Sequence, residues 1–367
     1  MRKIIVNATA LTTGGGINIL NQFIDQLSEE FEYLIFINSK LNIQSNRTNI
    51  NFVKKNINSI LDRLIQDFYG INRWLNKNNI YPSATISLQN TNFRFSNSIP
   101  NFIYFHHALP FYPKRWNPFK KTERKLWFYK NIYPFFIKLF INKNTEIFVQ
   151  TNFIRDNFAN YFNFPIDKIH VVSPKFNPLT INHEEHLSLK CDEDRLNIFY
   201  PATTFPYKNH QIILNALNNI DPELGKLITL HLTCKRSDLK YLEPLFHNIN
   251  INFLGEIPHS KVIEIYLRSD ALLFPSYIET YGLPLIEAAS LGLPIIVADL
   301  PYAREVLMDY EGVKFVPYDN ILLWKDEIVR LFDLKGKRYT PHVAKDADSW
   351  TKLFKIVKNK IHNNVQQ

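Results

Sequence analysis

Short runs of β-branched and aromatic residues alternate with amphipathic stretches along most of this chain. This alternation is typical of parallel α/β architecture, because parallel strands need a crossover helix between them and are buried on both faces. The predicted strands are Lys3–Asn7, Tyr33–Ile37, Ile50–Val53, Ala84–Ser87, Phe102–Phe105, Glu146–Val149, Ile169–Val172, Leu196–Tyr200, Leu227–Leu232, Ile251–Phe253, Ala271–Phe274, Ile295–Ala298 and Lys314–Val316. The predicted helices in the second half cover residues 208–219, 237–247, 259–268, 284–291 and 301–308, and a terminal amphipathic helix covers 350–362.

The chain of 367 residues is too long for one ordinary core, so we expect two domains. Residues 173–194 contain prolines, a His-Glu-Glu-His stretch and an acidic triplet, which is the composition of a linker. We therefore expect a doubly wound domain over 1–175, a linker over 176–194 and a second doubly wound domain over 195–345. The remaining 346–367 should pack back toward the first domain. Doubly wound domains bind ligands at the carboxyl ends of their strands, so the expected site is the cleft between the two.

Composition excludes several classes of protein. Hydrophobic residues make up 46% and charged residues 21%, which is a globular composition and excludes a disordered, collagen-like or coiled-coil chain. The two cysteines, Cys191 and Cys234, have no short spacing that would predict a disulfide framework or a thiolate metal site. No window approaches the roughly 20 apolar residues of a membrane span, and the first apolar run is interrupted too early for a signal peptide. We expect a cytoplasmic protein.

The segment 274–294 carries the most informative pattern. A buried strand ends here, and Pro284 suits the first turn of the following helix, where a missing N–H costs nothing. Glu279 then belongs to the loop before the helix and Glu287 to the helix itself. Gly282 allows a close approach to the free N–H groups at the helix N-terminus, which attract a phosphate. The carboxylates beside it can accept hydrogen bonds from sugar hydroxyls.

The motif Pro-Ser-x-x-Glu-x-x-Gly-Leu-Pro-x-x-Glu-Ala over 275–288 resembles the signature of retaining GT-B glycosyltransferases of family 4, the glycosyl transferases group 1. The resemblance implies a fold of two Rossmann-like domains facing a central cleft. It places Glu279 at the donor sugar and Glu287 at the ribose hydroxyls of the nucleotide. The backbone near Gly282 and Leu283 would contact the donor phosphates.

Other segments are similar to this family at single positions. Lys208, in a loop after a predicted strand, matches the lysine that binds the diphosphate, where it would stabilise the developing charge of the leaving group. The arginine that many members place about five residues earlier is absent, and Thr203 stands in that region. Gly15 and Gly16 match the glycine-rich loop that faces the diphosphate, and His106 matches a histidine near the transferred sugar.

Metal ligands are not convincing in this sequence, and we expect catalysis without a metal. The strings Asp192-Glu193-Asp194 and Asp346-Ala347-Asp348 have the D-x-D form that binds metal in the other large glycosyltransferase fold. Their positions, in the linker and beside the terminal helix, favour solvated charge instead. His183 and His186 lack a third ligand for zinc.

The positive charge of the chain is concentrated in residues 111–143. This segment has nine basic residues and one acid, a net +8 of the chain's +9. Basic residues beside aromatic rings favour the headgroup zone of an anionic membrane, and that is the interpretation we prefer. Two alternatives stay open: single-stranded nucleic acid, and core aromatics with merely solvated lysines. The residues proposed for membrane or acceptor contact are Lys114, Arg115, Lys120, Lys121, Arg124, Lys125 and Trp127. The other aromatic residues are Phe111, Tyr112, Trp116, Phe119, Phe128, Tyr129, Tyr133, Phe135, Phe136 and Phe140.

These features together predict a retaining glycosyltransferase that takes a sugar from a UDP- or GDP-sugar. The expected acceptor is a hydroxyl on a glycan, a lipid-linked oligosaccharide for a bacterial surface polysaccharide such as O-antigen or capsule. The expected location is the inner face of the cell membrane, with no nucleic-acid partner. The alternatives are a GT-B-like sugar-nucleotide epimerase, which needs no acceptor, and a non-catalytic scaffold that binds membrane or nucleic acid.

Overall fold

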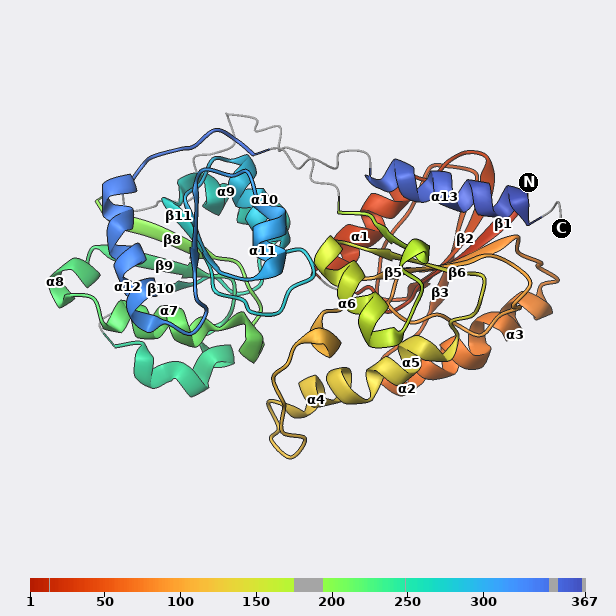
Figure 1. Ribbon diagram of the computed structural model, residues 1–367, viewed down its shortest axis with the longest axis horizontal. Helices are drawn as coiled ribbons and strands as arrows, with labels where there is room; N and C mark the ends of the chain where they lie inside the picture. The colour runs from red at the N-terminus through yellow and green to blue at the C-terminus, as the bar shows by residue number, and fades with distance from the viewer. Residues whose placement is uncertain (13, 175–193, 248, 343–348, 365–367) are drawn as a thin grey trace. The chain divides into compact units, whose positions relative to one another are not determined.

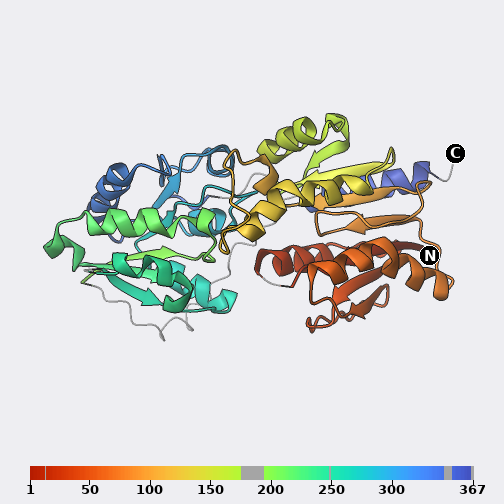
Figure 2. The same cartoon turned by 90° about the horizontal axis from the view of Figure 1, so that it is seen from below.

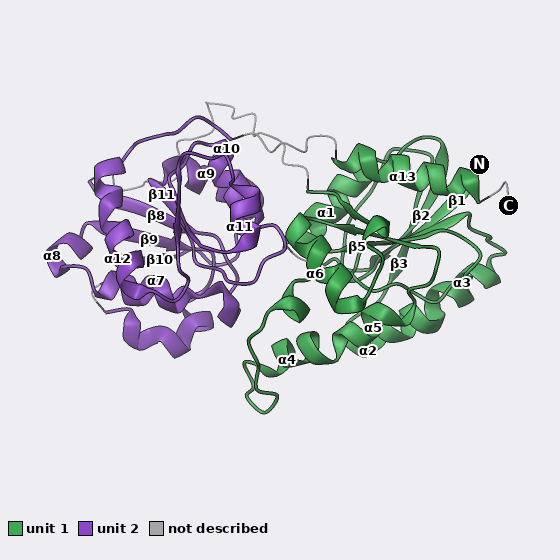
Figure 3. Ribbon diagram, in the orientation of Figure 1, with its two compact units in different colours: residues 1–175, 346–367 green, residues 176–345 purple. Residues whose placement is uncertain are grey.

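The chain forms two compact units, which Figure 3 shows in separate colours. The computed structural model describes residues 1–12, 14–174, 194–247, 249–342 and 349–364. Unit 1 consists of Met1–Lys175 and Asp346–Gln367, and unit 2 of Phe176–Lys345. Most of the predicted linker 176–194 lies outside the described residues, as does the start of the terminal segment 346–367. In the described part of the chain, every helix is too short or too polar to cross a membrane.

Unit 1 contains a parallel sheet of seven strands in the order β3-β2-β1-β4-β5-β6-β7 (Figure 1). The strand order reverses between β1 and β4, which makes this pair the topological switch point of the sheet. Its strands are β1 (Arg2–Ala8), β2 (Phe31–Asn38), β3 (Ile50–Lys55), β4 (Ala84–Ser87), β5 (Asn101–Phe105), β6 (Thr145–Val149) and β7 (Ile169–Val171). Its helices are α1 (Gly14–Asp25), α2 (Ile60–Ile65), the π-helical turn η1 (Gln66–Gly70), α3 (Ile71–Lys77), α4 (Arg124–Asn131), α5 (Tyr133–Leu139), α6 (Asn152–Phe162) and α13 (Ser349–Asn363), with short 3₁₀ turns at Leu109–Phe111 and Ile166–Lys168.

Both faces of the unit 1 sheet are buried, as parallel strands require. Along β1, Ile4 and Val6 belong to one hydrophobic cluster, and Ile5 belongs to a second cluster on the other face. Helices α1 and α13 pack on the first face, where Trp350 stacks on Tyr104 with ring centroids 5.3 Å apart. The last helix of the chain therefore completes the core of the first unit (Figures 1 and 2).

Unit 2 contains a parallel sheet of six strands in the order β10-β9-β8-β11-β12-β13. Here the order reverses between β8 and β11. The strands are β8 (Leu196–Tyr200), β9 (Ile228–Leu232), β10 (Asn250–Phe253), β11 (Ala271–Phe274), β12 (Ile295–Ala298) and β13 (Val313–Val316). The helices are α7 (His210–Asn218), α8 (Pro222–Gly225), α9 (His259–Arg268), α10 (Leu283–Ser290), α11 (Pro301–Val306) and α12 (Ile321–Arg330), with 3₁₀ segments at Pro206–Lys208, Arg236–Leu245 and Leu331–Leu334.

The predicted helix 301–308 ends two residues early, at Val306, and two other predicted helices differ for reasons that the backbone shows. The helix predicted over 208–219 starts only at His210, because Asn209 has a left-handed φ of 57° and ends a preceding 3₁₀ turn. The helix predicted over 237–247 is instead the 3₁₀ segment Arg236–Leu245. Leu239 has non-helical dihedral angles and Pro244 cannot donate a backbone hydrogen bond, so a regular α-helix does not form there.

Candidate active site

The switch point of unit 2 brings two ionisable side chains together. Lys208 lies in the segment that follows β8, and Glu279 lies in the loop that follows β11. Because β8 and β11 are adjacent parallel strands, their carboxyl ends meet at the same edge of the sheet. Residues 71 positions apart in the chain thus form one ion pair, in which Lys208 Nζ donates to Glu279 Oε1.

The Lys208–Glu279 pair is shielded from water but still accessible. The two side chains retain 17% and 15% of their exposure. The Lys208 ammonium also lies over the rings of Tyr207 and Phe274, at 5.6 and 5.9 Å from the centroids. Aromatic faces attract a cation without neutralising it. The pair therefore offers a positive and a negative group side by side, ready to bind an anion and a hydroxyl.

Tyrosine side chains hold the two loops around this pair. Tyr302 donates a 2.6 Å hydrogen bond to the carbonyl of Ser276, and Tyr200 donates one of 2.6 Å to the carbonyl of Lys208. Burial, with a contribution from the Glu279 charge, raises the pKa of Tyr200, Tyr207 and Tyr302 above the usual value. These phenols therefore stay protonated, and they position the loops without adding charge.

Gly282 directs the start of α10 toward the same edge. Its φ of +84° is left-handed, and a Cβ at this position would lie 3.0 Å from Leu285 Cδ1. Leu283 and Pro284 form the first turn of α10, one residue earlier than predicted. Pro284 has no N–H, and the Leu285 N–H donates to the Gly282 carbonyl at 2.8 Å. The Leu283 N–H and the positive end of the helix dipole are what this turn offers a phosphate.

Glu287 lies inside α10 and is held by two partners. Tyr266 donates to Glu287 Oε2 at 3.2 Å, and His259 Nε2 lies 2.9 Å from Glu287 Oε1. Glu287 is buried, whereas 60% of the His259 side chain is exposed. The hydrogen bond to Glu287 raises the pKa of His259 above its usual value. His259 is not among the residues predicted from the sequence; the available signal was its place after Gly-Glu-Ile-Pro at the start of the predicted helix 259–268.

Gly15 and Gly16 lie in the first turn of α1 rather than in the preceding loop. The helix begins at Gly14, which has a φ of +50°. A Cβ on Gly16 would lie 3.3 Å from Leu11 Cδ2, whereas one on Gly15 would meet no described atom within 4 Å. Glycines are tolerated in this turn because its N–H groups have no helical partner in any case. This turn follows the carboxyl end of β1, at the switch point of unit 1.

His106 and His107 follow β5 and are neutral at physiological pH. Burial lowers the pKa of His106 to about 4 and that of His107 to about 3. The backbone N–H of His106 donates to Asn90 Oδ1 at 2.6 Å, whereas its ring Nδ1 has no hydrogen-bond partner among the described residues. His106 therefore carries a neutral imidazole whose Nδ1 is buried and unpaired among the described residues.

The basic segment 111–143 divides into buried and exposed side chains. Trp116 and Tyr133 are core residues and Trp127 is half-buried, so these rings support the fold. Phe119 and Phe135 are exposed, with 95% and 64% of their surface accessible. The proposed cationic contacts are exposed as well; they are Lys114, Arg115, Lys120, Lys121, Arg124 and Lys125.

Over the described residues, no three His, Cys, Asp or Glu side chains gather in a way that could hold a metal ion. The acidic strings at 192–194 and 346–348 lie outside the described residues, except for Asp194, and so do His183 and His186. Two cavities of about 270 and 400 Å³ open at the amino ends of β4 and β5 and of β12 and β13, away from the edges that carry the candidate residues.

A doubly wound unit with a cation, a carboxylate and a helix N-terminus at its switch point is an α/β ligand-binding domain suited to a phosphorylated ligand. Residues 182–342 match the family model of the glycosyl transferases group 1. The O-antigen chain mannosyltransferase RfbU of Salmonella typhimurium is 26% identical over 225 residues. That alignment covers 59% of this chain and 60% of the relative, so the chain spans less than two thirds of its length.

Solved structures show the same fold. A sucrose-phosphate synthase from Thermosynechococcus elongatus has a TM-score of 0.74 at 10% identity, covering 98% of this chain and 99% of that one. WaaG, a glycosyltransferase involved in lipopolysaccharide biosynthesis, has a TM-score of 0.65 at 12% identity, covering 100% and 95%. The predicted fold class, GT-B with two Rossmann-like doubly wound domains, is thereby confirmed.

Proposed function

We propose that this protein is a retaining glycosyltransferase that moves a sugar from a UDP- or GDP-sugar to a hydroxyl of a glycan acceptor. The observation that carries the proposal is the Lys208–Glu279 pair at the switch point of unit 2, beside Gly282 and the N-terminus of α10. The family match over 182–342 includes all of these residues. The donor would lie at this edge, and its binding in a cleft between the domains stays a prediction.

Each group at this edge has a proposed role in the reaction. Lys208, the Leu283 N–H and the positive end of the α10 dipole stabilise the negative charge that develops on the leaving nucleoside diphosphate. The diphosphate replaces Glu279 as the partner of Lys208, and Glu279 then accepts hydrogen bonds from the sugar. Glu287 accepts hydrogen bonds from the ribose. In unit 1, His106 is proposed to contact the transferred sugar, and Gly15 and Gly16 the diphosphate. The acceptor attacks from the face of the leaving group, as the family resemblance implies.

The acceptor we propose is a lipid-linked glycan of O-antigen or a related surface polysaccharide. RfbU is named an O-antigen chain mannosyltransferase and WaaG is described as acting in lipopolysaccharide biosynthesis, which supports this class of acceptor and favours mannose as the sugar. No metal is assigned a role in this proposal.

We also propose that unit 1 docks on the anionic inner surface of the cell membrane. Exposed apolar side chains accompany the exposed cations of 111–143, and α2 and η1 add further ones next to α5. Arg63 of α2 donates to the Tyr133 hydroxyl of α5 at 2.6 Å, which shows that these elements are neighbours. Apolar side chains surrounded by cations are suited to an acidic lipid interface. The exposed apolar residues are Ile60, Leu61, Ile65, Tyr69, Phe119, Ile132, Phe135 and Leu139.

The decisive experiment incubates the purified chain with a panel of UDP- and GDP-sugars, including a mannosyl donor. Each donor is tested with and without a lipid-linked glycan acceptor, and nucleoside diphosphate and sugar product are followed. Acceptor-dependent release of diphosphate with one donor is the expected result, and the anomeric configuration of the product tests retention. Conversion of the donor without acceptor would instead identify an epimerase, and no reaction with any donor would favour a scaffold.

A further inference from the structure

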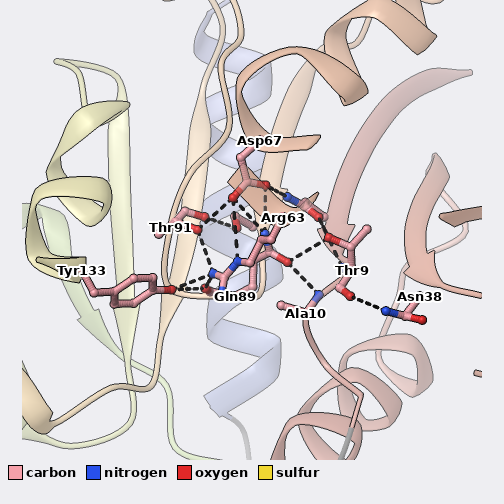
Figure 4. Close-up of polar contacts among 10 residues, drawn as sticks. Thr9, Ala10, Asn38, Arg63, Asp67, Gln89, Thr91 and Tyr133 are labelled. Atoms are coloured by element: carbon pink, nitrogen blue, oxygen red, sulfur yellow. Dashed lines mark hydrogen bonds and ion pairs between the residues drawn. The ribbon is translucent and has the colours of Figure 1, made fainter. Parts of the chain in front are cut away.

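A buried polar cluster occupies the switch point of unit 1, where the carboxyl ends of β1 and β4 meet (Figure 4). It joins residues from the end of β1, the helical segment α2–η1, the loop after β4 and helix α5. Except for Tyr133, which was named only as an aromatic residue of 111–143, no residue selected from the sequence belongs to it. We call it the switch-point cluster; its members are Asn7, Thr9, Arg63, Asp67, Gln89, Thr91 and Tyr133.

Gln89 connects this cluster to the turn between β1 and α1. Its Oε1 accepts a hydrogen bond of 2.9 Å from the backbone N–H of Ala10 and one of 3.2 Å from the Thr9 hydroxyl. Its Nε2 donates to Asp67 Oδ1 at 3.0 Å. The Asp67 carboxylate can only accept a hydrogen bond, and the Ala10 backbone N–H can only donate one. The Gln89 amide can therefore bond to both groups in only one orientation, with Nε2 toward Asp67 and Oε1 toward Ala10. The position of the turn thus depends on which way Gln89 faces.

Asp67 is the acceptor that fixes this orientation. It is 3% exposed and also accepts from Asn7 Nδ2 at 2.8 Å and from the Thr91 hydroxyl at 3.2 Å. Asp67 belongs to the π-helical turn η1, and π-helical turns occur frequently at functional sites. Arg63, one turn earlier, is the nearby cation, with Nε 3.9 Å from Asp67 Oδ2.

Burial in the folded protein disfavours the charged form of Asp67. Burial raises the pKa of Asp67 to about 6, although Arg63 and the hydrogen-bond donors lower it. Because this pKa lies above that of an unfolded Asp, the contribution of Asp67 to stability falls as the pH rises from about 4 to about 6. Glu146, buried at the opposite edge of the same sheet, shows the reverse: hydrogen bonds from His170 and Lys360 hold its pKa below the usual value. The ionised form of Glu146 is thus stabilised by its partners, whereas the ionised form of Asp67 is disfavoured by its burial.

We propose that Asp67 and Gln89 are positioning residues that fix the β1–α1 turn, and with it the glycine turn at Gly15 and Gly16, for binding of the donor diphosphate. This inference rests on the proposed function for the identity of the ligand. Asp67 acts through Gln89 and does not touch the donor. The ionised carboxylate accepts a charge-assisted hydrogen bond from the Gln89 amide, and protonation of Asp67 weakens this bond.

The other titratable groups around Asp67 keep their charge states between pH 5 and pH 7. Arg63 stays protonated, since its pKa is raised above its usual value. Burial raises the pKa of Tyr133, so its phenol stays neutral. His106 and His107 follow the neighbouring strand β5 and are neutral above about pH 4. A change in donor binding near pH 6 that depends on position 67 therefore reports on Asp67.

The test compares Asp67→Asn, Gln89→Leu and the mild variant Thr91→Val with the control Glu146→Gln in the full chain. Steady-state kinetics with the active donor are measured from pH 5.5 to 8, and hydrogen–deuterium exchange is followed over residues 9–20. In Gln89→Leu we expect faster exchange in this segment and a donor KM about tenfold higher, with kcat changed less, the effect of one lost buried hydrogen bond. In the wild type the donor KM should rise as the pH falls through about 6, and in Asp67→Asn this dependence should disappear.

The two readouts separate this inference from the proposed function. If exchange over 9–20 and the donor KM of the cluster variants match those of Glu146→Gln, the cluster is structural only and the inference is wrong. If the wild type turns over no donor, the proposed function fails, and the exchange measurement still decides whether Asp67 and Gln89 hold the turn. Thr91→Val keeps the side-chain shape and removes one donor to Asp67, so it supplies the comparison if Gln89→Leu does not fold.

Discussion

Lys208 and Glu279 form an ion pair in the structure, so each charged group already has a partner before a ligand binds. A lysine left alone under aromatic rings would have no counter-charge, and a carboxylate among buried phenols would lose its most favourable neighbour. A diphosphate can replace Glu279 at Lys208, and sugar hydroxyls can replace Lys208 at Glu279. The ion pair thus marks two subsites with one contact.

Lys208→Ala and Glu279→Gln should each lower kcat by about 100- to 1,000-fold, the usual effect of removing one group that stabilises transition-state charge. The double variant should lose less than the product of the two single losses, since the residues are in contact. Rates of nucleoside diphosphate release measure this. Lys226→Ala, which breaks an exposed pair with Glu223, is the control and should leave kcat unchanged. Full activity in both single variants would contradict the site assignment.

His259 makes a pH-dependent contribution to the stability of unit 2. Glu287 raises the pKa of His259 above 6.5, so the pair stabilises the fold fully below pH 6.5, and this contribution is lost as the pH rises through the raised pKa. His259→Ala should therefore cost more unfolding free energy at pH 6 than at pH 8. The difference should stay below about 1 kcal/mol, because the imidazole is largely exposed. Urea unfolding at both pH values tests this, with His247→Ala as the control; an equal cost at both would exclude a charged pair.

At the scale of elements, the start of α10 depends on the backbone of Gly282. Gly282→Ala should destabilise unit 2 by about 1–2 kcal/mol, because a left-handed φ strains any residue with a Cβ. It should also raise the donor KM, since the first N–H groups of α10 would move. Gly336→Ala is matched to it: the φ is +71°, but a Cβ there meets no described atom within 4 Å. Equal donor KM values in the two variants would argue against phosphate binding at α10.

Helix α13 belongs structurally to the unit at the other end of the sequence. The ring of Trp350 is 2% exposed, stacks on Tyr104 and donates its indole N–H to Gln22 Oε1 at 3.0 Å. Trp350→Ala should therefore destabilise unit 1 by about 3–5 kcal/mol through loss of this packing. Chemical unfolding monitored by fluorescence of the remaining tryptophans measures it. Lys352→Ala, on the exposed side of the same helix, should change the unfolding free energy by less than about 0.5 kcal/mol.

At the scale of the whole molecule, the net positive charge is concentrated in one segment of the chain. Nearly all of the formal +9 comes from residues 111–143, and the structure leaves most of these cations exposed. Replacing Lys120, Lys121, Arg124 and Lys125 by Ala should lower binding to vesicles containing acidic lipid by up to about a thousandfold, at about 1 kcal/mol for each cation. Co-sedimentation with neutral and anionic vesicles measures this. Replacing four exposed lysines of unit 2 is the control; these are Lys226, Lys240, Lys335 and Lys337. Binding that ignores lipid charge would contradict membrane docking through this segment.

The predicted strands are all present, with bounds within two residues of those observed. Strands such as Ala271–Phe274 and Ile295–Ala298 are continuous apolar runs that only a sheet covered on both faces can bury, and such runs are visible in sequence. The prediction of helix bounds was less accurate where the dihedral angles of a single residue end or bend the helix. Asn209 and Leu239 end or bend helices through dihedral angles that their residue types do not require.

Motif and tertiary structure contributed different parts of the candidate site. The sequence by itself determined the alternation of strands and helices, and the grouping of the predicted strands into two sets on either side of a linker. It also determined the motif around Glu279 and Gly282. Each of these features depends on residues close together in the chain. Only the tertiary structure decided which distant side chains meet. Lys208 meets Glu279, His259 meets Glu287, and Asp67 meets Gln89. The members of each pair lie on loops or helices that follow different strands, and the order of strands in the sheet brings those segments together.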